Sequence, residues 1–359
     1  MRGVPVTVGG VSSPAPARRL LAVVTVLLVL AMSGGGGCSG AGTAGRQQKP
    51  NPDAKALPTA SPVLSTTGKM AITPQWDEAG AFHEGRAAIR VGSEDAGTWG
   101  YIDGTGRVVI PPTYLSATSF ADGLAAVFVT GINRYGYIDA SGTIVIGPRF
   151  RDARPFSEGL GSVRLDDASD RWSYIDRSGA VANMPSLVGA RPFHDGLART
   201  GWLSFGFIDR SGAVVIEPRF GDADDFSEGL ARVRLDIRDS RYGYIDKTGR
   251  LVIAVQYFRA GHFSEGLAPF SGEQPGPCGY IDTQGRTIIR PRFGLCGDFS
   301  QGLAPVLIGD IDTGKWGYID KHGEMVITPQ FYAAGPFREG LAPVLVGPWG
   351  TGTWGYISR

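Results

Sequence analysis

Alternating large apolar and small or polar residues mark short β-strands along this chain, and residues 316–331 show the pattern most clearly. Residues 316–319 read Trp-Gly-Tyr-Ile, which has the two-residue period of a strand. Asp320 and Gly323 follow. Asp hydrogen-bonds the turn backbone and Gly supplies a positive φ, so they predict a tight hairpin turn. A second strand at residues 324–327 ends before Pro329, because proline lacks the N–H that a strand ladder needs.

Two further strands complete this unit. A short stretch with alanines leads to residues 337–340, Phe-Arg-Glu-Gly, which predict a second turn. Residues 341–344, Leu-Ala-Pro-Val, predict the last strand. The short connections make all four strands antiparallel. We interpret the aromatic residue before Gly317 as a core anchor, and the acidic residues before the turn glycines as turn-capping residues.

The pattern occurs eight times. The residues at the Trp-Gly position are Trp99, Tyr135, Trp172, Phe205, Tyr242, Cys278, Trp316 and Trp354. The aspartates of the first turn are Asp103, Asp139, Asp176, Asp209, Asp246, Asp282 and Asp320, at intervals of 33 to 38 residues. A nearly fixed period of this length indicates a repeat architecture. The fold class is therefore all-β, with eight four-stranded units.

The two ends of the array complement each other. Residues 68–76 match residues 323–331, so the array begins after the first strand of a unit, whereas residues 354–357 supply such a first strand at the end. A closed ring would pair the last strand into the first sheet and leave no free edge. We therefore favour a closed propeller-like ring over the alternative, an open curved β-solenoid.

These units resemble the WG (KWG-type) repeat of bacterial proteins, with its sequence W-G-Y-I-D-x-x-G-x-x-V-I-x-P-x-F followed by F-x-E-G-L-A. The resemblance extends over residues 68–359. The copy around residues 172–207 departs most, with Trp172-Ser173-Tyr174 at one border and Phe205-Gly206-Phe207 at the other. The resemblance implies no enzymatic activity and assigns no catalytic residue.

The N-terminal residues predict export. Residues 1–37 combine three arginines and no acid with an apolar run at 20–32, which is typical of a signal peptide. The small residues before Cys38 resemble a bacterial lipobox, so we expect lipidation at Cys38; a plainly cleaved signal and an uncleaved anchor are the alternatives. Residues 38–67 are rich in Gly, Ala, Ser, Thr and Pro and predict a flexible linker. Residues 68–359 would then form a β domain outside the plasma membrane.

Composition and motifs exclude several function classes. The formal net charge of the chain is +1, and three of its arginines lie in the expected signal peptide, so nothing predicts nucleic-acid binding. The four histidines lie in different units without metal-ligand spacing. Nucleophile elbows, phosphate loops and dinucleotide fingerprints are absent from the sequence. We expect no enzyme activity, cofactor or metal.

Binding is expected where the units differ. The connector between the Leu-Ala-x-Val strand and the next Trp-Gly strand varies in length and content, and equivalent loops of a repeat array lie on one face. Acidic connector residues are the first candidates: Glu94, Asp95, Asp166, Asp167, Asp170, Asp236, Asp239, Asp310 and Asp312. They predict a surface for a protein partner or a cation-bearing ligand, although solvated turns would look the same. The alternative function is carbohydrate or cell-wall binding through Trp202 and Trp349.

Two cysteines replace two repeated residue types in the same unit. Cys278 occupies the aromatic position, and Cys296 occupies a position that is alanine in the other seven units. An aromatic side chain packed over alanine would account for the usual pair, and a disulfide would replace it here. The alternatives are two separate buried thiols and a two-cysteine metal site.

Overall fold

The computed structural model describes residues 68–359 except 167–170, 185–188 and 190. These residues belong to one compact unit, Ser61–Arg359. The expected signal peptide, Cys38, the linker, Asp167 and Asp170 lie outside the described residues. All regular structure in the described part is β-strand, and it contains no helix that could cross a membrane.

The described strands form seven antiparallel sheets. Five have four strands, and each of these has a strand of two residues at one edge. These five are β2 (Glu78–Ala79), β3 (Ala87–Val91), β4 (Thr98–Ile102) and β5 (Val108–Tyr114); β15 (Asp222–Ala223), β16 (Leu230–Arg234), β17 (Tyr242–Asp246) and β18 (Leu251–Tyr257); β19 (Arg259–Ala260), β20 (Leu267–Ser271), β21 (Cys278–Asp282) and β22 (Thr287–Phe293); β23 (Leu295–Cys296), β24 (Ala304–Ile308), β25 (Lys315–Ile319) and β26 (Met325–Phe331); and β1 (Lys69–Trp76), β29 (Thr353–Ser358), β28 (Leu341–Val346) and β27 (Ala333–Ala334).

The other two sheets have six and three strands. They are β6 (Ser116–Ala117), β7 (Ala125–Val129), β8 (Arg134–Ile138), β9 (Ile144–Ser157), β10 (Leu160–Leu165) and β11 (Trp172–Ile175); and β12 (Ala198–Gly201), β13 (Phe205–Ile208) and β14 (Val214–Phe220). The expectation of eight four-stranded units is therefore wrong in its number of sheets. The continuous strand β9 pairs with β8 through its first half and with β10 through its second half, so it joins two units in one sheet.

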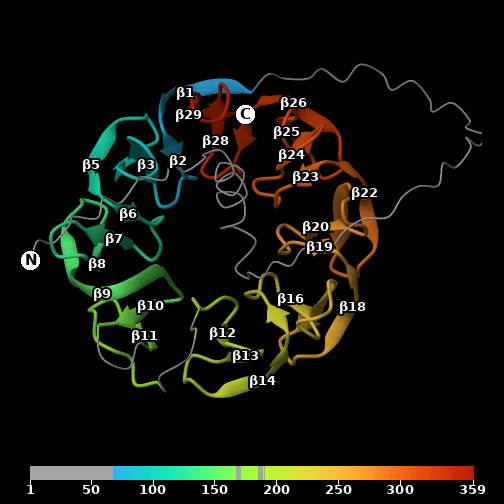
Figure 1. Ribbon diagram of the computed structural model, residues 1–359, viewed down its shortest axis with the longest axis horizontal. Coiled ribbons are helices and arrows are strands. Elements are labelled where there is room, and N and C mark those ends of the chain that lie inside the picture. The colour runs from blue at the N-terminus through green and yellow to red at the C-terminus, as the bar shows by residue number, and fades with distance from the viewer. Residues whose placement is uncertain (1–67, 167–170, 185–188, 190) are drawn as a thin grey trace, which may run out of the picture. The chain divides into compact units, whose positions relative to one another are not determined.

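The sheets surround a common axis as a propeller-like ring (Figure 1). The longer strands β1, β5, β14, β18, β22 and β26 lie on the outer circumference, and the shorter strands lie inside. β1 pairs with β29, placing Ile72 opposite Tyr356 and Trp76 opposite Trp354. β29 also pairs with β28, so the last strand of the chain is internal to its sheet. The ring is closed through the two ends of the array, in place of the open solenoid.

Each Trp-Gly glycine has a steric cause. A Cβ on Gly100 would lie 2.4 Å from the carbonyl oxygen of Ile110, and one on Gly279 would lie 2.2 Å from that of Ile289, on the neighbouring outer strand. A side chain cannot fit at such distances. Ser173 replaces this glycine on β11, and the only described pairing on its outer side is a single bridge from Ile175 to Val181.

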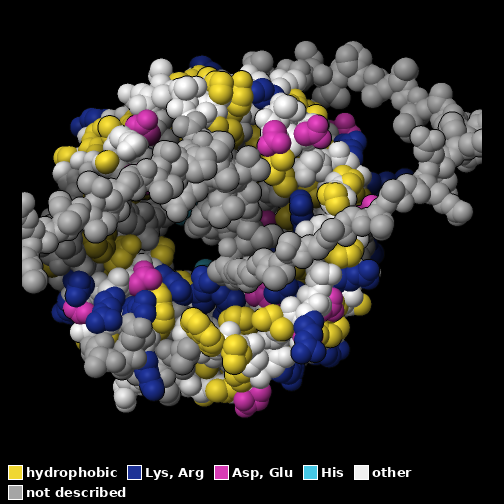
Figure 2. All heavy atoms as spheres, viewed as in Figure 1, with side chains coloured by type: hydrophobic (Ala, Val, Ile, Leu, Met, Phe, Trp, Pro, Cys, Tyr) yellow, Lys and Arg dark blue, Asp and Glu magenta, His cyan; other side chains and the backbone are white. Residues whose placement is uncertain are grey.

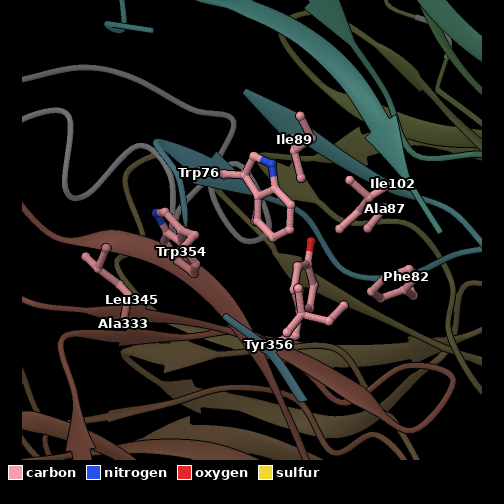
Figure 3. Close-up of a cluster of buried hydrophobic side chains, with 11 residues drawn as sticks. Trp76, Phe82, Ala87, Ile89, Ile102, Ala333, Leu345, Trp354 and Tyr356 are labelled. Carbon is pink, nitrogen blue, oxygen red and sulfur yellow. The ribbon is translucent and has the colours of Figure 1, made fainter. Parts of the chain in front are cut away.

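The core is continuous around the ring because the aromatic ring at the Gly-Tyr-Ile position packs on the phenylalanine of the following Phe-x-Glu-Gly turn. This turn leads into the next sheet in every unit except that of Tyr137 and Phe156, which lie on β8 and β9 of the six-stranded sheet. All eight such pairs have ring centroids 4.8 to 5.0 Å apart: Tyr101–Phe120, Tyr137–Phe156, Tyr174–Phe193, Phe207–Phe226, Tyr244–Phe263, Tyr280–Phe299, Tyr318–Phe337 and Tyr356–Phe82. Figure 3 shows the last pair within the cluster that closes the ring, beside Trp76 and Trp354. The Tyr356 hydroxyl also donates to the Gly80 carbonyl at 2.8 Å, across the junction of the two ends.

A second set of contacts forms what we call the turn belt, the Glu-Gly turns that precede the Leu-Ala-x-Val strand, the last strand of each sequence unit. Both turn residues have positive φ, for example 54° at Glu84 and 74° at Gly85, as a two-residue hairpin of type I′ requires. We expected the first residue to cap its own turn, but the structure shows a different contact. Its side chain accepts the N–H of the turn glycine in the next unit, as in Gly123 N–H to Glu84 Oε2 at 2.9 Å.

The turn belt is closed all round the ring. Its donor–acceptor pairs are Gly123–Glu84, Gly159–Asp122, Gly196–Glu158, Gly229–Asp195, Gly266–Glu228, Gly302–Glu265, Gly340–Gln301 and Gly85–Glu339. Asn and Gly are the residues that most readily take the first position of such a turn. Asp, Glu or Gln is present instead, because each has a side-chain oxygen that accepts the N–H of the neighbouring unit.

We expect the belt bond of Asp122 to contribute about 1 kcal/mol, the usual net value of a hydrogen bond to a partly buried group. Asp122→Gly keeps a backbone that tolerates a positive φ but removes the acceptor, so the melting temperature should fall. Asp122→Asn keeps both properties and should melt like the wild type. Equal melting temperatures for the two variants would show that the belt bond adds no stability.

The first turns behave as the sequence predicted. In the turn that begins at Asp103, the Oδ1 atom accepts the N–H of Thr105 at 3.0 Å and the Thr105 hydroxyl at 2.6 Å. The Thr105 hydroxyl and the other turn donors lower the pKa of Asp103 to about 2. The repeated aspartates are thus used within their own turns.

Candidate functional site

The connectors lie together on one face of the ring. The Leu-Ala-x-Val strand of each unit, such as β3, begins at a turn of the belt and ends at a connector. The turn belt and the connectors therefore lie on opposite faces of the ring. On the face drawn in Figure 2, hydrophobic side chains gather over β12 to β14, and Lys and Arg side chains gather over β9 to β12. The sequence placed all its acidic candidates in the connectors.

Three of those acidic candidates hold the connector structure. Asp166 forms ion pairs with Arg134 at 2.7 Å and Arg151 at 2.8 Å, and hydrogen bonds from the two arginines lower its pKa. Asp236 and Asp239 accept the backbone N–H groups of residues 238 and 241, which are in their own loop, at 2.8 and 2.9 Å. These side chains are engaged by the chain itself.

Four other acidic candidates have no side-chain partner among the described residues. They are all exposed and lie in two connectors, with Glu94 and Asp95 between β3 and β4 and Asp310 and Asp312 between β24 and β25. Within the described part of the chain, no group of three or more His, Cys, Asp or Glu side chains is placed to hold a metal ion. These carboxylates are available to a partner as dispersed charges.

The two candidate tryptophans are far apart. Trp202 is in the connector between β12 and β13 and is 75% exposed; Trp349 precedes β29 and is 39% exposed. Trp349 also packs edge-on against Trp354, with ring centroids 6.4 Å apart. Figure 1 shows the two connectors on opposite sides of the ring, so the tryptophans do not form a single aromatic platform.

Sequence reasoning missed the apolar character of the connectors. Leu203 is 80% exposed beside Trp202, and Ile237 is 63% exposed in the connector after β16. Ile132 and Ile311 are exposed at equivalent places. The sequence contains one or two large apolar residues in each of these connectors, and this feature would have identified the positions. Together they give the connector face an apolar content that the acidic residues alone did not suggest.

A charged cluster inside the ring was missed as well. Arg154, Arg191, Arg199 and Arg232 occupy positions where other units have small residues or proline, as alignment of the repeats would have shown. Arg199 Nη1 donates to the Ala223 carbonyl at 2.5 Å and lies 3.8 Å from the Asp222 carboxylate. Burial lowers the pKa of Arg199, and the nearby Arg191 lowers it further.

The same cluster continues into the next two sheets. Arg232 bonds the Asp224 carboxylate and donates to the Ala260 carbonyl, and its guanidinium lies 4.3 Å from the Tyr242 ring centroid. His262 is 3.8 Å from the Asp224 carboxylate. Burial raises the pKa of the neighbouring Asp298, against the opposing charges of His262 and Arg232. The arginines of this cluster pair with carboxylates and backbone carbonyls of the protein itself. These contacts connect consecutive sheets.

Cys278 and Cys296 are joined in the structure. Their Cα atoms are 6.1 Å apart and their sulfur atoms are at bonding distance, 2.11 Å. Cys278 is on β21 and Cys296 is on β23, so this disulfide links two neighbouring sheets. Trp99 and Ala117, the equivalent residues of another unit, pack against the same core cluster.

Comparison with known proteins gives a family match and distant structural likenesses. The family described as "WG containing repeat" matches residues 63–94, 99–131, 135–167, 205–236, 242–271, 279–310 and 316–347. No curated protein matches the chain.

Three solved structures illustrate the likenesses in fold. A eukaryotic initiation factor has 13% identity over 72% of this chain and 78% of its own, with a TM-score of 0.47. Virginiamycin B lyase from Staphylococcus aureus has 13% identity over 68% and 94%, with a TM-score of 0.40. The β-propeller domain of the Trilobed protease from Pyrococcus furiosus has 9% identity over 73% and 99%, with a TM-score of 0.44.

Proposed function

Because this chain belongs to the WG containing repeat family, we propose that it is a non-catalytic binding or scaffolding module of the cell envelope that presents its connectors to a protein partner. The observation that carries the proposal is the exposure of apolar connector tips, above all Trp202 at 75% and Leu203 at 80%. Exposed apolar groups that lie together and are flanked by polar residues are characteristic of protein interaction sites.

The repeated residues build the ring, which supports a binding role for the residues that vary. The repeated tyrosine and phenylalanine form the core between sheets, the repeated aspartate closes its own turn, and the belt acid bonds the next unit. Polar residues present in nearly every unit are thereby committed to building the ring. The residues that differ between units, in the connectors, are left to carry specificity.

We also propose that the ring has eight blades, with the six-stranded sheet counting as two that share β9. Eight equivalent aromatic pairs and eight turn-belt bonds, one of each per unit around the ring, support this number. An experimental structure that lacked the Tyr137–Phe156 ring contact or the Gly159–Asp122 hydrogen bond would contradict the eight-blade count.

Carbohydrate or cell-wall binding is the second candidate function. The exposure of Trp202 favours it, because an aromatic face can stack on a sugar ring. Trp349 would have to act separately, since it lies across the ring and is packed against Trp354.

The envelope location rests on residues 1–38 and remains our proposal. Lipidation of Cys38 would attach the domain to the membrane through the linker at 38–67. Cells labelled with a palmitate analogue should incorporate label in the wild type and lose it with Cys38→Ala. Equal labelling of the two proteins would contradict the anchor.

Crosslinked capture from envelope extract, using the full-length chain, tests the function. We expect a reproducible protein partner whose recovery falls strongly with Trp202→Ser and Leu203→Ser combined. Val214→Ser and Val215→Ser combined are the matched control, because these residues are also exposed and apolar but lie on the outer strand β14. Equal loss in both variants, or no loss in either, would argue against a connector-face interaction. Recovery of glycan in place of protein would favour the second function.

A further inference from the structure

The turn-belt face has a hollow of about 310 Å³ at the inner ends of four consecutive units. This volume is within the range of small-molecule sites. The residues around it are Phe82, His83, Glu84, Glu265, Ser300, Gln301, Arg338 and Glu339. The hollow lies on the face opposite the connectors, so it is separate from the proposed protein-binding surface.

The lining of this hollow departs from the repeat pattern. The residue between the turn phenylalanine and the belt acid is serine in four units, Ser157, Ser227, Ser264 and Ser300, and each hydroxyl donates to the carbonyl of the next unit's phenylalanine. Of the four units that border the hollow, two keep this serine, Ser264 and Ser300, and the other two have His83 and Arg338. The belt residue is an acid in seven units but Gln301 here.

A fourth departure lies beside the hollow. Arg86 follows the turn glycine at a position that is leucine in the other seven units, and its buried Nε atom has no hydrogen-bond partner. All four changes add positive charge, add a cation-forming side chain or remove an acid. His194 replaces the same serine in a unit away from the hollow, but only here does such a histidine occur together with Arg86, Gln301 and Arg338. This combination favours an anionic group.

The two side chains that replace serine are available to a ligand. Among the described residues, neither the Arg338 guanidinium nor the His83 imidazole makes a hydrogen bond or an ion pair. Burial lowers the pKa of His83 and the nearby Arg338 lowers it further, against the opposing charges of Glu339 and Glu84. The imidazole can donate a hydrogen bond to a ligand. Arginine presents a planar pair of donors that matches a carboxylate.

Acidic groups in the same hollow narrow the ligand class. Glu84, Glu265 and Glu339 each accept the N–H of one belt glycine, with N···O distances of 2.9 to 3.0 Å to the nearer carboxylate oxygen. Glu265 also forms an ion pair with Lys321 at 3.1 Å. A carboxylate has more acceptor sites than these bonds use. Multiply charged anions such as phosphate would be repelled by these three groups, whereas a ligand with one carboxylate and one ammonium group matches both sets.

We propose that this hollow binds a small zwitterionic carboxylate of the amino-acid or short-peptide class. Arg338 and His83 meet the ligand's carboxylate, and the belt carboxylates meet its ammonium group. The site is independent of the connector face, so the capture experiment and the ligand experiment can fail separately.

Calorimetric titration of the full-length chain with dialanine and with the free proteinogenic amino acids tests the proposal. We expect saturable binding of at least one of these probes, weakened by about tenfold or more in Arg338→Ser and in His83→Ser. Serine is the residue that four other units have at this position, so both variants should melt like the wild type or higher. His194→Ser is the matched control, because His194 occupies the same position in a unit away from the hollow, and it should bind like the wild type.

Blocked forms of the best probe and simple ions test whether the ligand needs both a free carboxylate and a free ammonium group. N-acetylation or C-terminal amidation of the best probe should each weaken binding by about tenfold or more, and inorganic phosphate and putrescine should not compete. The proposal is overturned if no probe gives a saturable signal, if the serine variants bind like the wild type, if His194→Ser weakens binding equally, or if the blocked forms bind as well as the free zwitterion.

Discussion

Deleting residues 354–359 should abolish most of the stability of the β domain. The deletion removes Trp354, Tyr356 and Ile357, which are buried in the closing sheet, and leaves β1 and β28 without the strand between them. Loss of each buried large side chain costs about 2–5 kcal/mol, and domains have only about 5–15 kcal/mol in total. We expect the melting temperature to fall by more than about 10 °C, or the cooperative transition to disappear.

A shorter truncation separates closure from simple loss of a chain end. Removing residues 358–359 alone keeps the three buried side chains and should shift the melting temperature only slightly. If the two truncations melt alike and close to the wild type, the terminal strand contributes no more than a frayed end. The ring would then not depend on its closure for stability.

Removing the disulfide should give the second large effect. Cys278 and Cys296 are 18 residues apart in sequence, and by chain entropy a loop of that length stabilises a fold by about 3 kcal/mol. Cys278→Ser and Cys296→Ser combined should lose about this much, measured by urea unfolding. The substitution also places two hydroxyl groups where a buried apolar pair belongs.

A back-to-pattern variant tests why the cysteines are there. Cys278→Trp and Cys296→Ala combined recreate the aromatic and alanine pair that the equivalent positions Trp99 and Ala117 have. It should recover a large part of the stability that the double serine variant loses. Thiol titration of a non-reduced, denatured Cys38→Ala protein provides the direct chemical check, and two reactive thiols would contradict the disulfide.

The strands and turns of this protein could be predicted from local sequence because each depends on a few neighbouring residues. The two-residue alternation at Trp-Gly-Tyr-Ile gives a strand, and Asp103 with Gly106 gives a turn that closes within itself. The match between residues 68–76 and 323–331 even indicated closure, because it showed which strand was missing at the start.

The grouping of strands into sheets was beyond the reach of a local pattern. Each sequence unit gives its Trp-Gly hairpin to one sheet and its remaining strands to the next, and β9 runs on without a break where other units are interrupted. Apart from β1 and β29, the described strands pair with their neighbours in sequence, so a sheet ends wherever the chain leaves the ladder between two consecutive strands. The residues of the two strands alone do not show where this happens. The eight sequence units therefore appear as seven sheets.

The sequence by itself determined a repeated all-β fold, the family and the connectors in which its units vary, and it favoured a closed ring over an open solenoid. Only the tertiary structure decided what the individual side chains do. The belt glutamates were interpreted as caps of their own turns, but folding brings each beside the glycine of the next unit. Asp166 looked like a binding residue until Arg134 and Arg151 were found beside it. His83, Gln301 and Arg338 acquire a common meaning only because the closed ring places the two ends of the array around one hollow. The strength of an interaction depends on distance and burial, which the order of residues does not contain.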